Sequence, residues 1–207
     1  MLNKIFGNLF FQRRKENESQ NTGNYIVATL NDKIMPIDRG EIYEDPLDIF
    51  LKQMNYGEVT GGGTSQHETG EIEYCDIEIK LYSGVIDIEI IQRIIDKLEE
   101  LGAPKGSRLL IEKTGERIPF GRKEGLAIYL DGINLPDEVY ENSDSEAIAS
   151  QIRRLANIQS EVLRYWQGNT ETALYFYDSS FNAIKASIEQ FVKENPECEN
   201  ARIVQIA

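Results

Sequence analysis

Residues 73–82 read EYCDIEIKLY, and from residue 75 onward apolar and charged side chains alternate, which predicts a β-strand with one dry face and one wet face. The dry side carries Cys75, Ile77, Ile79 and Leu81. The wet side carries Asp76, Glu78 and Lys80. A sheet built around this strand packs helices on one face and leaves its other face free.

The neighbouring segments complete a β-α-β-β-α-β order. The predicted elements are a strand at 25–30 (YIVATL), a helix from 45 to 57, strands at 58–63 and 73–82, a helix at 87–101 and a strand at 108–112, with one further strand at 125–130. Asp45-Pro46 marks the helix start, because an N-cap followed by proline favours the first turn. Residues 25–136 are therefore predicted to form a ferredoxin-like α+β domain, an antiparallel sheet with both helices on one face.

The rest of the chain predicts an αβαβ unit over 137–207. Ser143 and Glu146 have capping-box spacing at the start of a helix expected to reach Trp166. A strand at 172–177, a helix after Asp178 or Ser179 and a last strand at 201–206 follow. Two strands are too few to bury a core alone, so the unit is expected to join the first sheet or pack on it. No internal repeat is visible in the residues.

Residues 1–24 form a separate segment. The apolar positions of its predicted amphipathic helix are Leu2, Ile5, Phe6, Leu9 and Phe10. Basic residues at 13–15 follow the apolar stripe, the reverse of a secretory signal, so export is not expected. Three interpretations stay open for residues 2–15: a peripheral membrane contact, a partner contact, or packing or fraying at the protein's own terminus. Residues 16–24 are predicted to be a linker.

The composition is acidic, with 22 Lys and Arg against 35 Asp and Glu and a net charge of −13. Such a chain repels phosphate backbones, so nucleic-acid binding is not expected. Its field favours a basic protein partner, although acidity also serves solubility alone in the bacterial cytosol. Cys75 and Cys198 form no CxxC pair and are predicted to be reduced and buried, as in a cytoplasmic protein.

The glycine-rich stretch 57–64, GEVTGGGT, resembles a phosphate loop only in composition. Gly63 occupies the place where such a loop needs its lysine, so Gly61, Gly62 and Gly63 are interpreted as a bulged strand end or as a ligand or partner contact. His67 is the only histidine and is expected to lie on the surface. No catalytic residue, metal site or cofactor is predicted.

A run of carboxylates next to the glycines offers three interpretations: a solvated strand face, a docking surface for a basic partner, or a site for a hard cation. The run contains Glu68, Glu71, Glu73, Asp76 and Glu78. It lacks calcium-loop spacing. The aromatic residues Tyr165, Trp166, Tyr175, Phe176 and Tyr177 are expected to be core rather than interface.

The leading hypothesis is a non-catalytic, cytoplasmic binding protein of the immunity or antidote type, which inhibits a basic toxin enzyme through an acidic face. Its expected contact set is Glu71, Glu73, Asp76 and Glu78 with Gly61, Gly62 and Gly63. A regulatory or small-molecule-sensing module is the second hypothesis, with the glycine stretch as its ligand contact. A carboxylate- and metal-dependent enzyme is the third.

Overall fold

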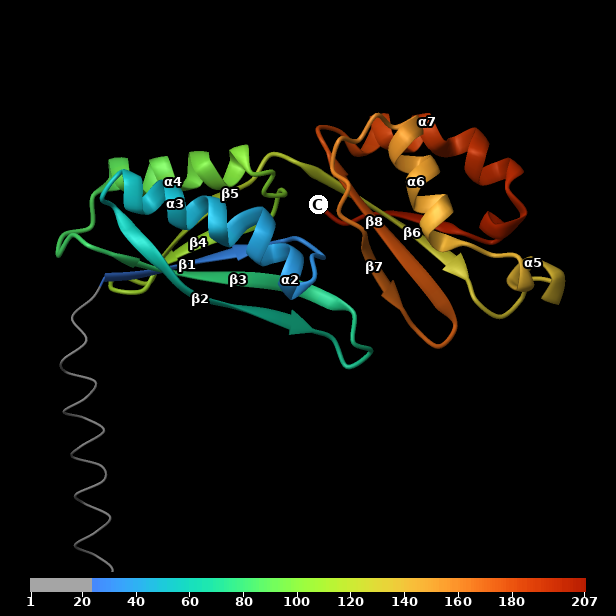
Figure 1. Ribbon diagram of the computed structural model, residues 1–207, viewed down its shortest axis with the longest axis horizontal. Coiled ribbons are helices and arrows are strands. Elements are labelled where there is room, and N and C mark those ends of the chain that lie inside the picture. Colours follow the sequence, from blue (N-terminus) through green and yellow to red (C-terminus); the bar gives the residue numbers. More distant parts are fainter. Residues whose placement is uncertain (1–23) are drawn as a thin grey trace, which may run out of the picture.

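The structure is a computed structural model in which residues 24–207 are described. These residues form a five-stranded sheet and a four-stranded sheet. The two sheets lie side by side, and each carries its helices on one face (Figure 1). The predicted amphipathic helix at 2–15 and its linker lie outside the described residues.

The first sheet has the predicted ferredoxin-like topology. Its strands are β1 (Asn24–Leu30), β2 (Gly57–Gln66), β3 (Ile72–Leu81), β4 (Ser107–Ile111) and β5 (Glu116–Phe120), in the spatial order β2-β3-β1-β4-β5. All neighbouring strands are antiparallel. The helices on its inner face are α2 (Pro36–Arg39), η1 (Gly40–Glu44), α3 (Asp45–Gln53) and α4 (Ile88–Glu100). The α+β fold class is thus confirmed, with β5 as an added edge strand.

The first helix begins at Pro36, earlier than the predicted start at Asp45-Pro46. A π-helical turn, η1, joins α2 to α3, and the amide of Asp45 donates to the carbonyl of Gly40, five residues back. Pro46 has no N–H to continue an ordinary ladder, and the wider turn accommodates it. The prediction also missed β5, which contains Pro119; proline is tolerated there because β5 is an edge strand.

The second sheet repeats the same topology. Its strands are β6 (Glu124–Asp131), β7 (Arg164–Gln167), β8 (Glu171–Asp178) and β9 (Arg202–Gln205), in the order β7-β8-β6-β9. Its helices are α5 (Asp137–Glu141), α6 (Ser145–Leu155), α7 (Phe181–Glu194) and η2 (Pro196–Cys198). Strand for strand, this is the order of the first sheet without β5. We call residues 24–120 the first module and residues 124–207 the second module.

This duplication corrects three predictions. The strand at 125–130 begins the second module instead of ending the first, so the division lies near residues 121–123 and not at 136. The last part of the chain therefore owns a complete sheet, where too few strands were expected, and of the two expected arrangements it packs on the first module. The helix expected to reach Trp166 ends at Leu155, because Arg164–Gln167 pair with β8 as strand β7.

Each module buries its core between its sheet and its helices. The alternation that opened the sequence analysis is confirmed: Cys75, Ile77, Ile79 and Leu81 are buried under α3 and α4, and the intervening residues face away from them. The second core centres on Leu126, Ile128, Leu174 and Phe176. Over residues 24–207, no helix is long and apolar enough to cross a bilayer.

Candidate functional site

A buried ion pair joins the two modules. Asp32 follows β1 and is 1% exposed, and Arg164 lies on β7. The guanidinium of Arg164 donates to both carboxylate oxygens, with Nε to Oδ1 at 2.7 Å and Nη2 to Oδ2 at 3.0 Å. The hydroxyl of Tyr43, from the π-helical turn, donates to Oδ2 at 2.8 Å. All three polar groups are thus satisfied by one another, which a buried charge requires.

The pKa values at this pair follow from burial and charge. Burial works against the charge on Arg164, but the attraction of Asp32 and the hydrogen bonds to it together raise the pKa of the guanidinium. Burial, then the charge of Asp32, raises the pKa of Tyr43 and that of Tyr177. The carboxylate of Asp32 therefore lies near a permanent cation and two neutral phenols. This arrangement holds the two modules in position and provides no group that readily exchanges a proton.

A second polar cluster at the junction surrounds Glu71. Its Oε1 accepts from the hydroxyl of Tyr175 at 2.8 Å and from the hydroxyl of Tyr129 at 3.1 Å, and Lys33 Nζ lies 3.8 Å away. Burial, then the charge of Glu71, raises the pKa of Tyr129 to about 12. Burial lowers the pKa of Lys33 although Glu71 opposes that shift. Nearby, Trp166 Nε1 donates to the carbonyl of Thr69 at 3.1 Å.

The junction therefore uses several residues that the sequence analysis assigned elsewhere. Glu71, expected to contact a partner, turns its carboxylate toward the second module of its own chain. Of the aromatic set, Phe176 belongs to the second core, whereas Trp166, Tyr175 and Tyr177 line the junction-facing side of that sheet and Tyr165 is exposed. Sequence reasoning did not single out Asp32 or Arg164, because neither belongs to a motif.

Of the other predicted contact residues, Asp76, Glu78, Gly61 and Gly63 lie on the helix-free face of the first sheet, which we call the open face. Asp76 pairs with Gly63 of β2, and Glu78 pairs with Gly61, so these four residues point to one side. Glu78 Oε1 accepts from the hydroxyl of Thr60 at 2.8 Å. Asp76 Oδ1 is buried and has no hydrogen-bond partner among the described residues.

The three glycines have different surroundings. Gly62 faces the helices, and a Cβ there would lie 2.7 Å from the carbonyl oxygen of Asp76 and 2.8 Å from Glu44 Oε1. The space next to Gly62 accommodates the side chain of Arg39. Its Nη1 donates to the Gly63 carbonyl at 2.6 Å, and its Nε pairs with Glu44. A Cβ on Gly61 or on Gly63 would meet no atom within 4 Å. All three lie within β2 and form no phosphate loop.

The remaining candidate residues have no neighbouring groups, among the described residues, that would suit catalysis or metal binding. His67 and Glu68 are exposed at the turn between β2 and β3, and Glu73 is exposed beside Ser65. Both cysteines are buried; burial raises the pKa of Cys75, and raises that of Cys198 to about 11. Within residues 24–207, no group of three or more His, Cys, Asp or Glu side chains could hold a metal ion.

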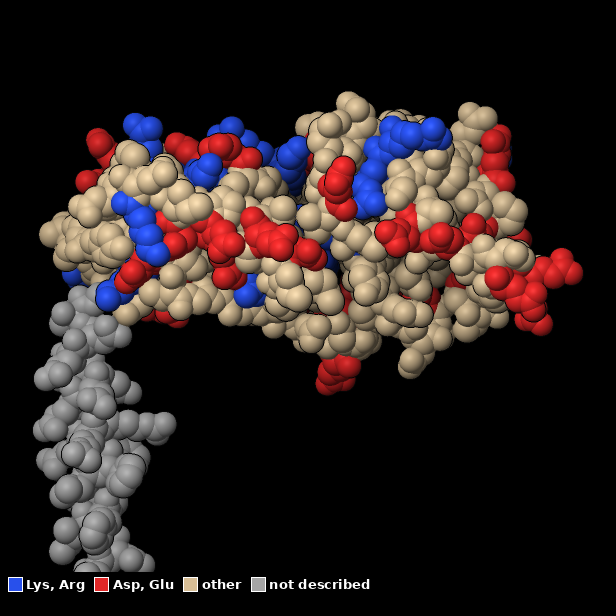
Figure 2. Space-filling view, viewed as in Figure 1, with Lys and Arg blue, Asp and Glu red and all other residues tan. Residues whose placement is uncertain are grey.

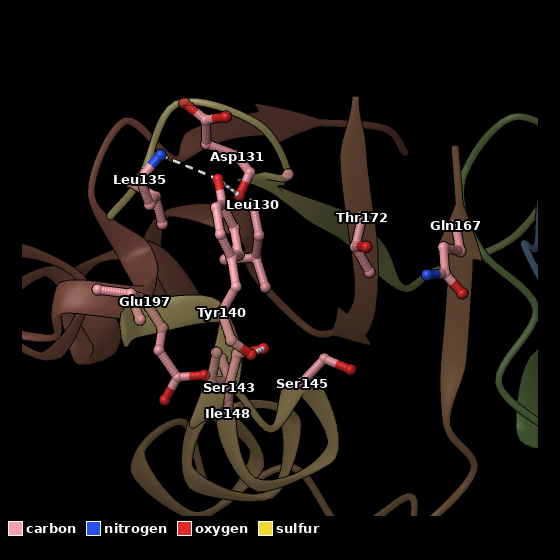
Figure 3. Close-up of a pocket in the computed structure, with 12 residues that line it drawn as sticks. Leu130, Asp131, Leu135, Tyr140, Ser143, Ser145, Ile148, Gln167, Thr172 and Glu197 are labelled. Atoms are coloured by element: carbon pink, nitrogen blue, oxygen red, sulfur yellow. Dashed lines mark hydrogen bonds between the residues drawn. The ribbon is translucent and has the colours of Figure 1, made fainter. Parts of the chain in front are cut away.

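A cavity of about 260 Å³ lies in the second module, where α5 and the start of α6 meet the ends of β6 and β8. Figure 3 shows Tyr140 across its centre, with the hydroxyl accepting from the Leu135 amide at 2.9 Å and lying 3.4 Å from the Asp131 carbonyl. Ser143, Ser145 and Glu197 stand on the opposite side (Figure 3). The sequence analysis did not identify this cavity, since its residues come from four separate segments.

Acidic side chains form a band over the helix run of the first module. Figure 2 shows this band and a second acidic group at the far end of the second module, around α5. The acidic band consists of Asp38, Glu41, Glu44, Asp45, Asp48 and Glu58. Basic neighbours neutralise it only in part, because Lys52 pairs with Asp48 and Arg39 with Glu44. The negative charge of the chain is therefore displayed beside strand β2.

Comparison with known proteins gives likeness in fold only. No family model and no curated protein matches the chain. A solved protein of unknown function from Galdieria sulphuraria is 8% identical, with a TM-score of 0.27 over 88% of this chain and 97% of that one. The first two RRM domains of a yeast poly(U) binding protein are 10% identical, with a TM-score of 0.23 over 88% and 99%. An anthrone oxidase-like protein is 14% identical, with a TM-score of 0.25 over 90% and 91%.

Proposed function

We propose that this protein is a non-catalytic, cytoplasmic binding protein of the immunity or antidote type, which inhibits a basic toxin enzyme through an acidic face. The observation that carries the proposal is how the ionisable groups are divided. Between the modules, Asp32 meets Arg164 and the partly buried Glu71 meets two tyrosines. Within the first module, the buried Arg39 pairs with Glu44. The exposed ones present an acidic surface along the helix run and β2 of the first module (Figure 2).

The division supports binding rather than chemistry for a physical reason. An acid, base or nucleophile must reach a substrate with its proton or lone pair available. At the junction these atoms are committed to partners within the chain, whereas an exposed acidic surface attracts a basic partner by charge complementarity. Partner steering by charge raises association rates and declines with salt.

The test is affinity capture from the native cell with the full chain as bait, across a salt series. The expected result is a basic protein held in a 1:1 complex and released as salt rises. That protein is then purified, and its enzymatic activity is measured with and without this chain. Failure to recover a stoichiometric basic protein, or full activity of the recovered enzyme at saturating chain, would reject the proposal.

A small-molecule-sensing function is the second candidate, because both apolar and hydroxyl-bearing side chains line the cavity around Tyr140. Its lining does not include the glycines that the sequence analysis assigned to the ligand. A metabolite library screened by thermal shift addresses it, since a ligand at 100 times its Kd stabilises the native state by about 2.7 kcal/mol. Ser145→Tyr, which would fill the cavity, should abolish any shift due to this site.

A further inference from the structure

The helix-free face of the second sheet is covered, so it shows which kind of segment such a face can bind. It is covered by two segments of the first module, the loop after β1 with Asp32 and the β2–β3 hairpin with Glu71. A carboxylate anchors each segment to this face. Asp32 accepts from Arg164, and Glu71 accepts from tyrosine hydroxyls. The chain thus contains one example of a loop and a hairpin docked on a ferredoxin-like sheet.

The strand registers allow the helix-free faces of the two sheets to be aligned residue by residue. In β6 and β9, Ala127 pairs with Val204 and Tyr129 with Arg202, matching Val27 with Leu110 and Thr29 with Arg108 in β1 and β4. Carried into the other strands, this alignment gives four equivalences across the two open faces. They are Gly61 with Arg164, Gly63 with Trp166, Asp76 with Ala173, and Glu78 with Tyr175.

The comparison shows two differences. The large side chains that grip the docked segments in the second module are replaced in the first by Gly61 and Gly63, over which there is open space. The charge also differs, because Asp76 and Glu78 stand where the second module has Ala173 and Tyr175, while Arg108 keeps the place of Arg202. The first open face therefore carries two carboxylates that the second lacks.

Several charged residues on the first open face have a local partner. Lys80 lies 4.0 Å from Glu58, Arg108 stacks on the ring of Tyr74, and Glu78 accepts from Thr60. Asp76, beside Gly63, keeps a carboxylate oxygen without a hydrogen-bond partner among the described residues. A cation placed over Gly63 would lie next to this carboxylate and would supply the partner that Asp76 lacks.

We propose that the open face of the first sheet docks a basic loop or hairpin of a partner protein, with an arginine or lysine seated over Gly61 and Gly63 and paired with Asp76. This inference rests on the proposed function and names how its partner is recognised. A second copy of the chain is a poor occupant, because the corresponding segments of the second module carry Asp131 and Glu171, which Asp76 and Glu78 would repel.

The first test uses arginine amide as the probe, with citrulline amide as its uncharged counterpart. The probe is titrated at low salt into the ¹⁵N-labelled full chain, and the amide signals of Gly61 and Gly63 are followed. Arginine amide should shift both signals saturably, and citrulline amide should not. Asp76→Asn should weaken the binding about fivefold, whereas Asp96→Asn, the same change on exposed α4, should leave it unchanged.

Gly63→Val gives a variant whose loss of binding is not loss of fold. Valine suits a strand, and open space surrounds this position, so the Tm should be unchanged or raised. The valine should nevertheless block the shifts caused by arginine amide. Absent shifts in the native chain, or equal shifts in Asp76→Asn, would overturn the proposed docking face.

Binding of a captured basic partner to the variants distinguishes failure of this inference from failure of the proposed function. If that partner binds Asp76→Asn and Gly63→Val as tightly as the native chain, the docking face is wrong and the binding function stands. If both variants lose the partner while Asp96→Asn keeps it, the docking face is supported. If arginine amide occupies the face but capture yields no basic partner, the inference about the face holds and the proposed function fails.

Discussion

Asp32 and Arg164 lie 132 residues apart in sequence and form a two-pronged ion pair between the modules, with distances of 2.7 and 3.0 Å. Tyr43 completes the set from the π-helical turn, and the ring of Tyr177 lies 5.4 Å from the guanidinium carbon. A charge pair that is buried in this way specifies one arrangement of its surroundings, since any displacement leaves a desolvated charge without a partner. We conclude that it sets how the two modules meet.

Arg164→Ala should lower the free energy of unfolding by about 3–5 kcal/mol, because Asp32 would be left as an unpaired buried charge. The matched control is Arg122→Ala, which breaks an exposed pair with Glu99 and should cost at most about 1 kcal/mol. Urea unfolding checks both variants, with Trp166, the only tryptophan, as a fluorescence reporter of the junction. Equal losses for the two variants would contradict the role of the buried pair.

The junction tyrosines predict a loss of stability at alkaline pH. The folded pKa of Tyr129 is raised from 10.0 to about 12, so the folded state holds this proton more tightly than the unfolded chain does. The contribution is complete below pH 10 and is lost as pH rises toward 12. Tyr129→Phe should therefore unfold with a shallower dependence on pH across this window. Identical slopes for the native chain and the variant, measured by urea unfolding, would refute the assignment.

Gly62 and Gly63 predict opposite outcomes for the same substitution. Gly62→Ala places a Cβ 2.7 Å from the Asp76 carbonyl oxygen and 3.0 Å from Arg39 Nη2, and should cost about 1–3 kcal/mol. Gly63→Ala enters open space and should be neutral or stabilise by up to about 1 kcal/mol, through a less flexible unfolded chain. Thermal unfolding of the two variants, side by side, decides this; a destabilised Gly63→Ala would show that its face is already filled.

The two thiols should be inert in the folded protein. Cys75 and Cys198 are buried with raised pKa values, so little thiolate is available to react at pH 8. A chromogenic disulfide reagent should titrate no thiol in buffer and two in denaturant. Rapid reaction of one thiol under native conditions would contradict its burial.

Local sequence patterns were sufficient for much of the first module. The alternation around Ile77 and Ile79 identified the inner and open faces, because a half-buried strand exposes one side at every second residue. Strong local signals also placed the helix that ends before Gly102. For the candidate site, the pattern put Asp76 and Glu78 on the open face, and it associated them with the glycines that pair with them.

Patterns without a distinct period were assigned wrongly. Val162, Leu163 and Trp166 suit a helix stripe, yet Val162 and Leu163 precede β7, and Trp166 lies in β7 on the same face of the sheet as Arg164. Strand β6 reads as a continuous apolar run, since helices cover one of its faces and the junction covers the other. Such a run signals burial on both sides and does not reveal which strands are its partners.

The sequence by itself determined the acidic character of the chain, the dry and wet sides of its central strand, and the ferredoxin-like order of the first module. Only the tertiary structure decided that this order occurs twice, that Glu71 serves the junction, and that Asp32 meets Arg164. The reason is that periodicity reports the immediate surroundings of a residue along its own element. Contacts across 132 residues depend on how completed sheets pack, and no local preference encodes them.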